Sequence, residues 1–246
     1  MTSLETNAVP IPVLVIHLTT ATQRRQHIEK EFAHSKLPLH WITRGDIFDI
    51  TPEIEAAHFR GDLLGDHRAA IISCAYKHFL AYQAILEKGW PQALVVEDDI
   101  VLYRRFRGRL HQIQTEISQR KIANYIISIE DSALQYIPRS KRLPRRLLYK
   151  ALKGRMAGSY LTDATACKNM ISYIRQNKMH LPIDWMHNVM AEQHHIDIYW
   201  SQPALCVQGS ISGKTSSLID NKTSGIGRSV TFTLTRWYRQ FLCFLR

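Results

Sequence analysis

Apolar runs alternate with amphipathic segments along the first 130 residues of the chain. Runs typical of β-strands occupy residues 9–18, 37–46, 92–99 and 123–131, and helical spacing of apolar positions covers residues 19–32, 68–88 and 105–121. This alternation predicts an α/β fold with a mostly parallel central sheet flanked by helices on both faces. In such sheets, ligands bind beyond the carboxyl ends of the strands.

The second half of the chain shows a less regular pattern. Residues 138–155 hold eight basic residues and no acidic one, and we expect a mobile or surface-docked connection there. A strand or loop followed by a helix is predicted over residues 157–177, and a further helix after Pro182. A short strand is predicted within residues 196–208, before a stretch rich in Ser and Gly.

The C-terminal residues 233–246 place apolar side chains at i, i+3, i+4 and i+7 beside arginines. A short basic helix with Trp and Phe on its apolar face suits the surface of an anionic bilayer, although the same stripe could pack against the protein. We therefore expect a main domain over residues 9–220 and a basic amphipathic tail over residues 228–246 that could anchor the protein to a membrane surface.

The charge balance points to a polyanionic partner. Thirty-two Lys and Arg residues against 21 Asp and Glu give a net charge of +11, which suits nucleic acid, an anionic membrane or a phosphorylated substrate. The four cysteines are far apart and fit neither a zinc cluster nor a disulfide framework, so we expect reduced thiols. The N-terminus does not resemble a signal peptide, and no apolar run approaches the ~20 residues of a spanning helix, which favours a cytoplasmic protein.

Acidic residues follow two of the predicted strands. Glu97, Asp98 and Asp99 come directly after a Leu-Val-Val run, and Glu130 and Asp131 end the strand over residues 123–131. Strand ends face the ligand crevice in parallel sheets, so these carboxylates are expected to lie there. Glu97 and Asp99 point to one side of an extended segment, which makes these two candidates for binding a divalent cation through oxygen. The alternative is a solvated acidic turn that stabilises the next helix.

Several motifs in a shared order resemble glycosyltransferase family 25. The segment "ALVVEDDIVL" looks like the acidic DxD-type motif of that family, and "VLVIHLTTATQRR" resembles its opening strand. "GSYLTDATACKNMI", "LPIDWM" and "QPALCVQGSISGKTSSL" resemble later family segments, so the likeness covers roughly residues 12–218. Two departures stand out: the family's Gly-Cys-x-x-Ser-His is read as "AAIISC", which keeps only Ser73, and the opening Asn is His17.

The resemblance implies a single domain of the GT-A fold that uses a nucleotide-sugar donor, most commonly UDP-galactose, with Mn²⁺ or Mg²⁺. It also implies roles for individual residues. Asp99 would be the direct metal ligand with Glu97 beside it, and Asp98 would lie towards the ribose. Arg24, Arg25, Ser73, Tyr160 and Gln208 are further candidates for donor binding, although both arginines could be solvated helix residues. Asp184 is the leading candidate for the base that deprotonates the acceptor, followed by Asp131 and Glu130; Asp184 could equally be an N-terminal helix charge.

The predicted function is therefore metal-assisted transfer of a hexose to a lipid-linked, phosphorylated lipooligosaccharide or lipopolysaccharide core. The expected location is the cytoplasmic face of the bacterial inner membrane, with peripheral attachment through the basic tail. Two rivals remain. One is a nucleic-acid-binding protein, which the charge permits but no recognition motif supports. The other is a catalytically weakened family member that acts as a scaffold, which the "AAIISC" segment would support.

Overall fold

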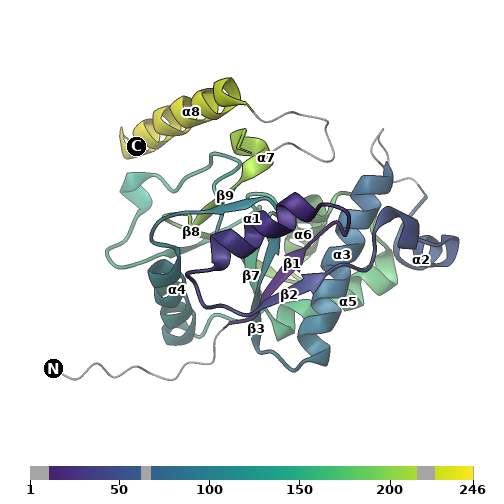
Figure 1. Ribbon diagram of the computed structural model, residues 1–246. Helices are drawn as coiled ribbons and strands as arrows, with labels where there is room; N and C mark the ends of the chain where they lie inside the picture. The colour runs from purple at the N-terminus through teal and green to yellow at the C-terminus, as the bar shows by residue number, and fades with distance from the viewer. Residues whose placement is uncertain (1–10, 62–67, 215–224, 246) are drawn as a thin grey trace.

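The computed structural model describes residues 11–61, 68–214 and 225–245, and its centre is a seven-stranded sheet (Figure 1). The strand order is β2-β1-β3-β7-β5-β8-β6. The bounds are β1 Val13–Ile16, β2 Leu39–Ile42, β3 Gln92–Glu97, β5 Tyr125–Ser128, β6 Leu148–Ala151, β7 Ser159–Asp163 and β8 Asp197–Ser201. Five of these strands run in one direction, and β6 and β7 run against them. The predicted α/β fold with a mostly parallel sheet is confirmed.

Helices cover both faces of the sheet because its strands are apolar on both sides. Val13 and Val15 of β1 face α1 (Thr22–Phe32) and α4 (Phe106–Arg120), in a core that also contains Leu94 and Ile127. Leu14 and Ile16 face the opposite core. That core is built from α3 (Arg68–Glu87), α5 (Ala164–Asn177) and α6 (Ile183–Glu192), and α2 (Pro52–His58) lies beside it.

The structure corrects the expectation for residues 138–155. Instead of only a surface connection, this segment contains a short 3-10 helix, η2 (Arg139–Lys141), and the edge strand β6, which pairs with β8. Arg155 at its end is fully buried. Its guanidinium donates to the carbonyl oxygen of Ser201 at 2.8 Å and lies 4.6 Å from the Trp200 ring centroid. The basic composition of this segment suggested that it is exposed. Part of the segment instead forms an edge strand, and one of its eight basic residues, Arg155, is buried.

A two-stranded ribbon lies beside the main sheet. Strand β4 (Ile100–Leu102) directly follows the acidic triplet of Glu97, Asp98 and Asp99, and it pairs antiparallel with β9 (Cys206–Gln208). The register places Ile100 opposite Gln208, and the Tyr103 N–H donates to the carbonyl oxygen of Leu205. The ribbon therefore joins residues that lie about a hundred positions apart in the sequence at the edge where β1, β3 and β5 end.

The C-terminal helix α8 (Ile226–Leu245) lies outside the helices that cover the sheet, above the short helix α7 (Gly209–Ser212), as Figure 1 shows in yellow. It contacts α7 and η2. Arg236 anchors it through an ion pair of 2.9 Å with the buried Asp131. The predicted amphipathic C-terminal helix is thus confirmed. Among the described residues, none of the helices is long and apolar enough to span a membrane.

Candidate active site

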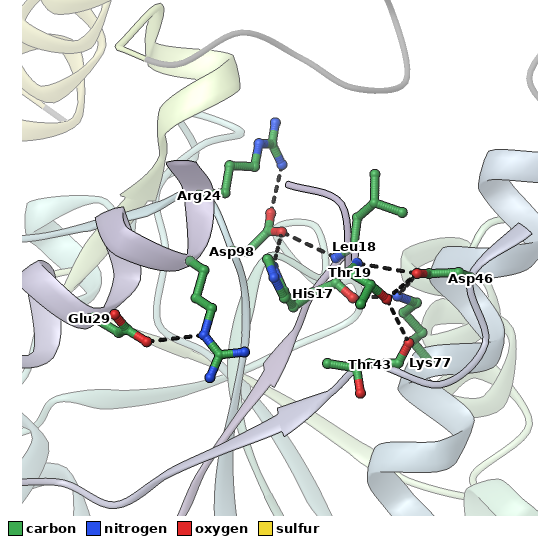
Figure 2. A network of polar contacts seen from close by, with 10 residues as sticks. His17, Leu18, Thr19, Arg24, Glu29, Thr43, Asp46, Lys77 and Asp98 are labelled. Atoms are coloured by element: carbon green, nitrogen blue, oxygen red, sulfur yellow. Dashed lines mark hydrogen bonds and ion pairs between the residues drawn. The ribbon is translucent and has the colours of Figure 1, made fainter. Parts of the chain in front are cut away.

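Asp98 is the centre of a buried polar network where β1 and β3 end (Figure 2). One of its oxygens lies 2.8 Å from His17 Nδ1, and the other accepts a hydrogen bond of 2.7 Å from Arg24 at the start of α1. The Leu18 N–H also points to this carboxylate. Burial disfavours the charged form, but the His17 hydrogen bond and the Arg24 charge outweigh it and lower the pKa of Asp98. Asp98 is therefore a fixed anion.

Lys77 connects a second group of polar residues at the ends of β1 and β2. This residue of α3 is 3% exposed and donates both to the His17 carbonyl oxygen and to Asp46. Asp46 also accepts from the Thr19 hydroxyl, so it joins the loop after β1 to the loop after β2 (Figure 2). Burial disfavours the charged form of Asp46, but hydrogen bonds from Lys77 and Thr19 and the charge of Lys77 outweigh it and lower the pKa of Asp46. A buried ammonium with two oxygen partners is a rigid positive point in this crevice.

A pocket of about 140 Å³ lies between these two groups. Arg24, Ser73, Glu97 and Asp98, which were all predicted as donor-binding residues, line it together with Lys77. Ser73 uses its hydroxyl to bond the Gly45 carbonyl oxygen at 2.7 Å. Two cationic and two acidic side chains therefore meet at one small pocket at the carboxyl ends of parallel strands.

Two further carboxylates, Asp99 and Glu130, are buried close to Glu97. Asp99 is 1% exposed; one of its oxygens accepts from the Ser210 N–H at 3.0 Å, and the other is buried without a hydrogen-bond partner in the described structure. Burial and the charge of Glu97 raise the pKa of Asp99. Burial, with Glu97 and Asp99, raises the pKa of Glu130 to about 8. Unrelieved repulsion and an orphaned carboxylate oxygen fit a divalent cation with oxygen ligands, as proposed for Asp99 and Glu97.

A second pocket of about 190 Å³ adjoins the first and shares Cys74 and Glu97 with it. Asp184, in the first turn of α6, lines this second pocket with Gln208. Burial, and secondarily the charge of Glu97, raises the pKa of Asp184, which improves a carboxylate as a proton acceptor near neutral pH. Glu97 therefore stands between two compartments, one that contains the Asp98 network and one that contains Asp184.

Gln208 holds Glu97 in place from the ribbon. Its side-chain amide donates to Glu97 at 2.9 Å, and its backbone N–H donates to the Ser132 hydroxyl at 2.9 Å. Gly158, which precedes β7, leaves the room for this side chain, because a Cβ there would lie 2.3 Å from Gln208 Nε2. The Glu97 N–H in turn donates to the Gly158 carbonyl oxygen.

A buried chain of polar side chains runs from Glu97 to helix α6. His78 Nε2 lies 3.9 Å from Glu97 and has no hydrogen-bond partner among the described residues, while its Nδ1 lies 2.8 Å from the Tyr160 hydroxyl. Tyr160 bonds the Tyr82 hydroxyl at 3.2 Å, which lies 2.6 Å from His187 Nε2. Burial lowers the pKa of His187 well below its ordinary value, so this end of the chain is neutral. Tyr160, a predicted donor-binding residue, belongs to this chain behind the pocket.

Three other predicted residues line neither pocket. Arg25 pairs with Glu29 at 3.1 Å and stacks over Trp41, on the exposed side of α1. Asp131 accepts from Tyr103 and Tyr136 and pairs with Arg236, so its carboxylate anchors α8. Glu130 is fully buried and bonded to the Ser159 N–H and the Ser132 hydroxyl.

Of the α3 residues at the site, sequence reasoning named only Ser73. Cys74, Lys77 and His78 face the site, and Cys74, His78 and Glu97 each offer an atom within 4.8 Å of the others'. The signal was their position as polar residues at i, i+3 and i+4 in an otherwise apolar helix. The six residues from Ser73 also contain the Cys and the His of Gly-Cys-x-x-Ser-His at the right spacing. The interpretation that only Ser73 remains of that pattern is therefore wrong.

The chain is similar in sequence to a family of known glycosyltransferases. Residues 11–187 match the model of "Glycosyltransferase family 25 (LPS biosynthesis protein)". A Haemophilus influenzae protein named "Putative glycosyltransferase" is 25% identical over 207 residues, which is 79% of this chain and 69% of that protein. Procollagen galactosyltransferase 1 of Danio rerio is 24% identical over 181 residues, or 68% and 30% of the two chains.

The name of another relative describes that protein as inactive. The "Probable inactive glycosyltransferase 25 family member 3" of Bos taurus is 22% identical over 181 residues, which cover 66% of this chain and 30% of that protein. The chain therefore spans less than a third of the length of either animal relative.

Proposed function

Because the chain belongs to glycosyltransferase family 25, we propose that it transfers a hexose from a nucleotide-sugar donor to a saccharide acceptor, using the two pockets that meet at Glu97. The observation that carries this proposal is that the two pockets are adjacent and share Cys74 and Glu97 as lining residues. One compartment offers paired charges for a nucleotide, the other offers a carboxylate with a raised pKa, and a transfer reaction needs two substrates side by side.

The first pocket is the proposed donor site. Arg24 and Lys77 supply positive charge for the diphosphate, and Asp98, held ionised by His17 and Arg24, is placed to accept from ribose hydroxyls. The network is fixed by hydrogen bonds before any donor binds, which lowers the cost of ordering the site. UDP-galactose is the proposed donor, in keeping with the galactosyltransferase name of the Danio rerio relative.

Asp99 and Glu97 are the proposed ligands of Mn²⁺ or Mg²⁺. The orphaned Asp99 oxygen and the raised pKa values of Asp99 and Glu130 support this assignment. When bound, the cation would neutralise the charge that develops on the leaving diphosphate. Gln208 keeps the Glu97 carboxylate oriented, and the Ser210 N–H does the same for Asp99.

The second pocket is the proposed acceptor site, and Asp184 is the proposed base. It would accept the proton of the acceptor hydroxyl as that oxygen attacks the sugar, provided that the reaction inverts the anomeric centre. The acceptor is proposed to be a lipid-linked, phosphorylated lipooligosaccharide or lipopolysaccharide core, in keeping with the description of the family model. The net charge of +11 supports a phosphorylated acceptor.

The proposed location is the cytoplasmic face of the bacterial inner membrane, with α8 at the lipid surface. Support comes from the exposed aromatic and aliphatic side chains on this helix, including Trp237 at 71% and Phe241 at 58% exposure. The domain boundaries predicted from the sequence, residues 9–220 and 228–246, would then separate the catalytic body from its anchor.

A scaffold role for a weakened enzyme remains a second candidate, because some relatives carry inactive names. Its support from the sequence is gone, since Cys74 and His78 keep the family spacing and face Glu97. Nucleic-acid binding is not favoured either, because the family match accounts for most of the chain.

A panel of nucleotide sugars with Mn²⁺ tests the proposed function, with donor hydrolysis and binding heat as readouts. We expect UDP-galactose to bind and to be hydrolysed slowly, and Asp99→Ala to abolish the metal-dependent hydrolysis while the variant stays folded. Asp197→Asn, at the start of β8 on the opposite edge of the sheet, is the matched control. Full hydrolysis by Asp99→Ala would refute the metal assignment, and absence of any sugar-nucleotide binding would refute the function.

A further inference from the structure

A basic pocket lies at the far end of the β4–β9 ribbon from the acidic triplet. It encloses about 450 Å³, within the usual size of a small-ligand site. Its lining residues include four arginines and no acidic residue. The arginines are Arg104, Arg105, Arg109 and Arg236, and Tyr103 also lines the pocket. Strand β4 separates Tyr103 from Asp99, and its three residues extend over ~10 Å.

The back of this pocket is rigid. Arg236 is held by its ion pair with Asp131 and lies 4.5 Å from the centroid of the Tyr103 ring. The Tyr103 hydroxyl donates to the same carboxylate at 2.6 Å. Asp131 is 1% exposed, so it fixes these two side chains from behind without presenting its own charge to a ligand.

The front of the pocket is an uncompensated positive surface. Arg104 and Arg105 are exposed and form no ion pair within the described part of the chain, and Arg109 contacts only the neutral Gln112 through its guanidinium. Arg105 is also the N-cap of α4, where no side chain caps the helix and no acidic residue occupies the first turn. The positive end of the helix dipole therefore adds to the three guanidinium charges.

We propose that this arginine pocket, formed by Tyr103, Arg104, Arg105, Arg109 and Arg236, binds a phosphate monoester. Guanidinium groups match phosphate oxygens in pairs, and a helix N-terminus with no acidic residue in its first turn favours the same dianion. A saccharide that spans from the second pocket along the ribbon would place its phosphate here. Naming the acceptor as the source of that phosphate rests on the proposed function; a lipid headgroup next to α8 offers the same chemistry.

Binding of glucose 6-phosphate, measured by titration calorimetry against glucose, tests the pocket without requiring any transfer. The double variant Arg104→Gln/Arg105→Gln should bind the phosphorylated sugar at least ~10-fold more weakly than the wild type, since two charge-assisted contacts are lost. Arg107→Gln/Lys168→Gln is the matched control, because it removes two exposed charges outside the pocket. Thermal melts verify that both variants fold.

A parallel arm identifies the source. Sedimentation with phosphatidylcholine vesicles, with and without phosphatidic acid, shows whether a lipid phosphate reaches the pocket. A loss of either phosphate-dependent interaction in the Arg104/Arg105 variant alone supports the pocket, and equal loss or no loss in both double variants overturns it. Binding of UDP-galactose is titrated separately, so that failure of the proposed function is told apart from failure of the pocket.

Discussion

Neighbouring carboxylates in this site differ because each has different partners. Asp98 faces two cationic or hydrogen-bonding groups, and its pKa is lowered. Asp99, the next residue, is buried beside Glu97, and its pKa is raised. Groups whose pKa values are pushed apart in this way commonly divide binding from proton or metal chemistry. The sequence could show three adjacent acids, but which one is paired depends on contacts from α1 and α7 that are remote in the chain.

Asp184→Asn tests the base at the residue scale. The amide keeps the shape of the side chain but cannot accept a proton, so we expect turnover to fall at least ~100-fold while donor affinity changes less than twofold. Steady-state kinetics with a saccharide acceptor, together with calorimetric donor titration, separates the two quantities. An unchanged turnover would remove Asp184 as the base, and Asp197→Asn again serves as the control.

Glu130→Gln tests the buried carboxyl through the pH dependence of stability. Its folded pKa of about 8 lies above the ordinary 4.5, so the folded state holds the extra proton between these values. Stability from this group is complete below about pH 4.5 and is lost as the pH rises towards 8. The variant lacks this titration, and we expect it to gain about 1 kcal/mol or more relative to the wild type between pH 6 and pH 8.5.

Urea unfolding in EDTA at the two pH values measures this difference. Chelation matters because a cation near Asp99 and Glu97 would relieve the repulsion that raises the pKa of Glu130. Parallel pH profiles for wild type and variant would show that Glu130 is already ionised in the folded state.

At the scale of elements, local patterns were sufficient where one segment buries its own apolar face. The strands β1, β3 and β5 and the helices α3 and α4 were all predicted close to their observed bounds. Strand β6 was missed because it is a short edge strand, and the basic residues that surround it in the sequence suggested an exposed connection. The ribbon was missed because β4 and β9 have only three residues each and owe their pairing to distant partners.

Gly158→Ala tests the coupling between β7 and the ribbon. The added methyl group would overlap the Gln208 side chain, which must move and release Glu97. We expect donor hydrolysis to fall ~10-fold or more, with a modest loss of stability, since one hydrogen bond to a charged group is worth about 1.5–3 kcal/mol. Gly108→Ala, in the open on α4, is the control and should stabilise the protein by about 0.5–1 kcal/mol without lowering activity. Normal hydrolysis by Gly158→Ala would show that Gln208 is not needed to orient Glu97.

For the whole molecule, the C-terminal helix is both attached and exposed. Arg228 donates to the Ser210 carbonyl oxygen at 2.8 Å and Arg236 pairs with Asp131, so the inner side of α8 is tied to residues next to the Asp99 site. Its outer side carries unburied aromatic and aliphatic groups. An amphipathic stripe in the sequence could not distinguish these two sides, because packing and lipid binding use the same periodicity.

Replacing the outer side chains therefore tests membrane docking better than deleting the helix, since deletion would also leave Asp131 buried without its cation. Trp237→Ser/Phe241→Ser removes two large exposed apolar groups and leaves Arg236 in place. With each side chain worth about 1.5–3 kcal/mol if it enters the lipid, binding to vesicles of phosphatidylcholine and phosphatidylglycerol should weaken at least ~10-fold. Wild-type binding should also fall as salt rises, because the arginines contribute electrostatically.

Gln240→Ala, an exposed polar position on the same helix, should leave vesicle binding unchanged. Co-sedimentation at several lipid concentrations gives the partition constants, and thermal melts confirm that each variant keeps its fold. If the double variant partitions like the wild type, lipid insertion of α8 is refuted, and its apolar side must be covered by something other than a bilayer. If the double variant loses vesicle binding and Gln240→Ala keeps it, α8 binds lipid through its outer side, and the two proposed substrate pockets lie in a protein that works at a membrane surface.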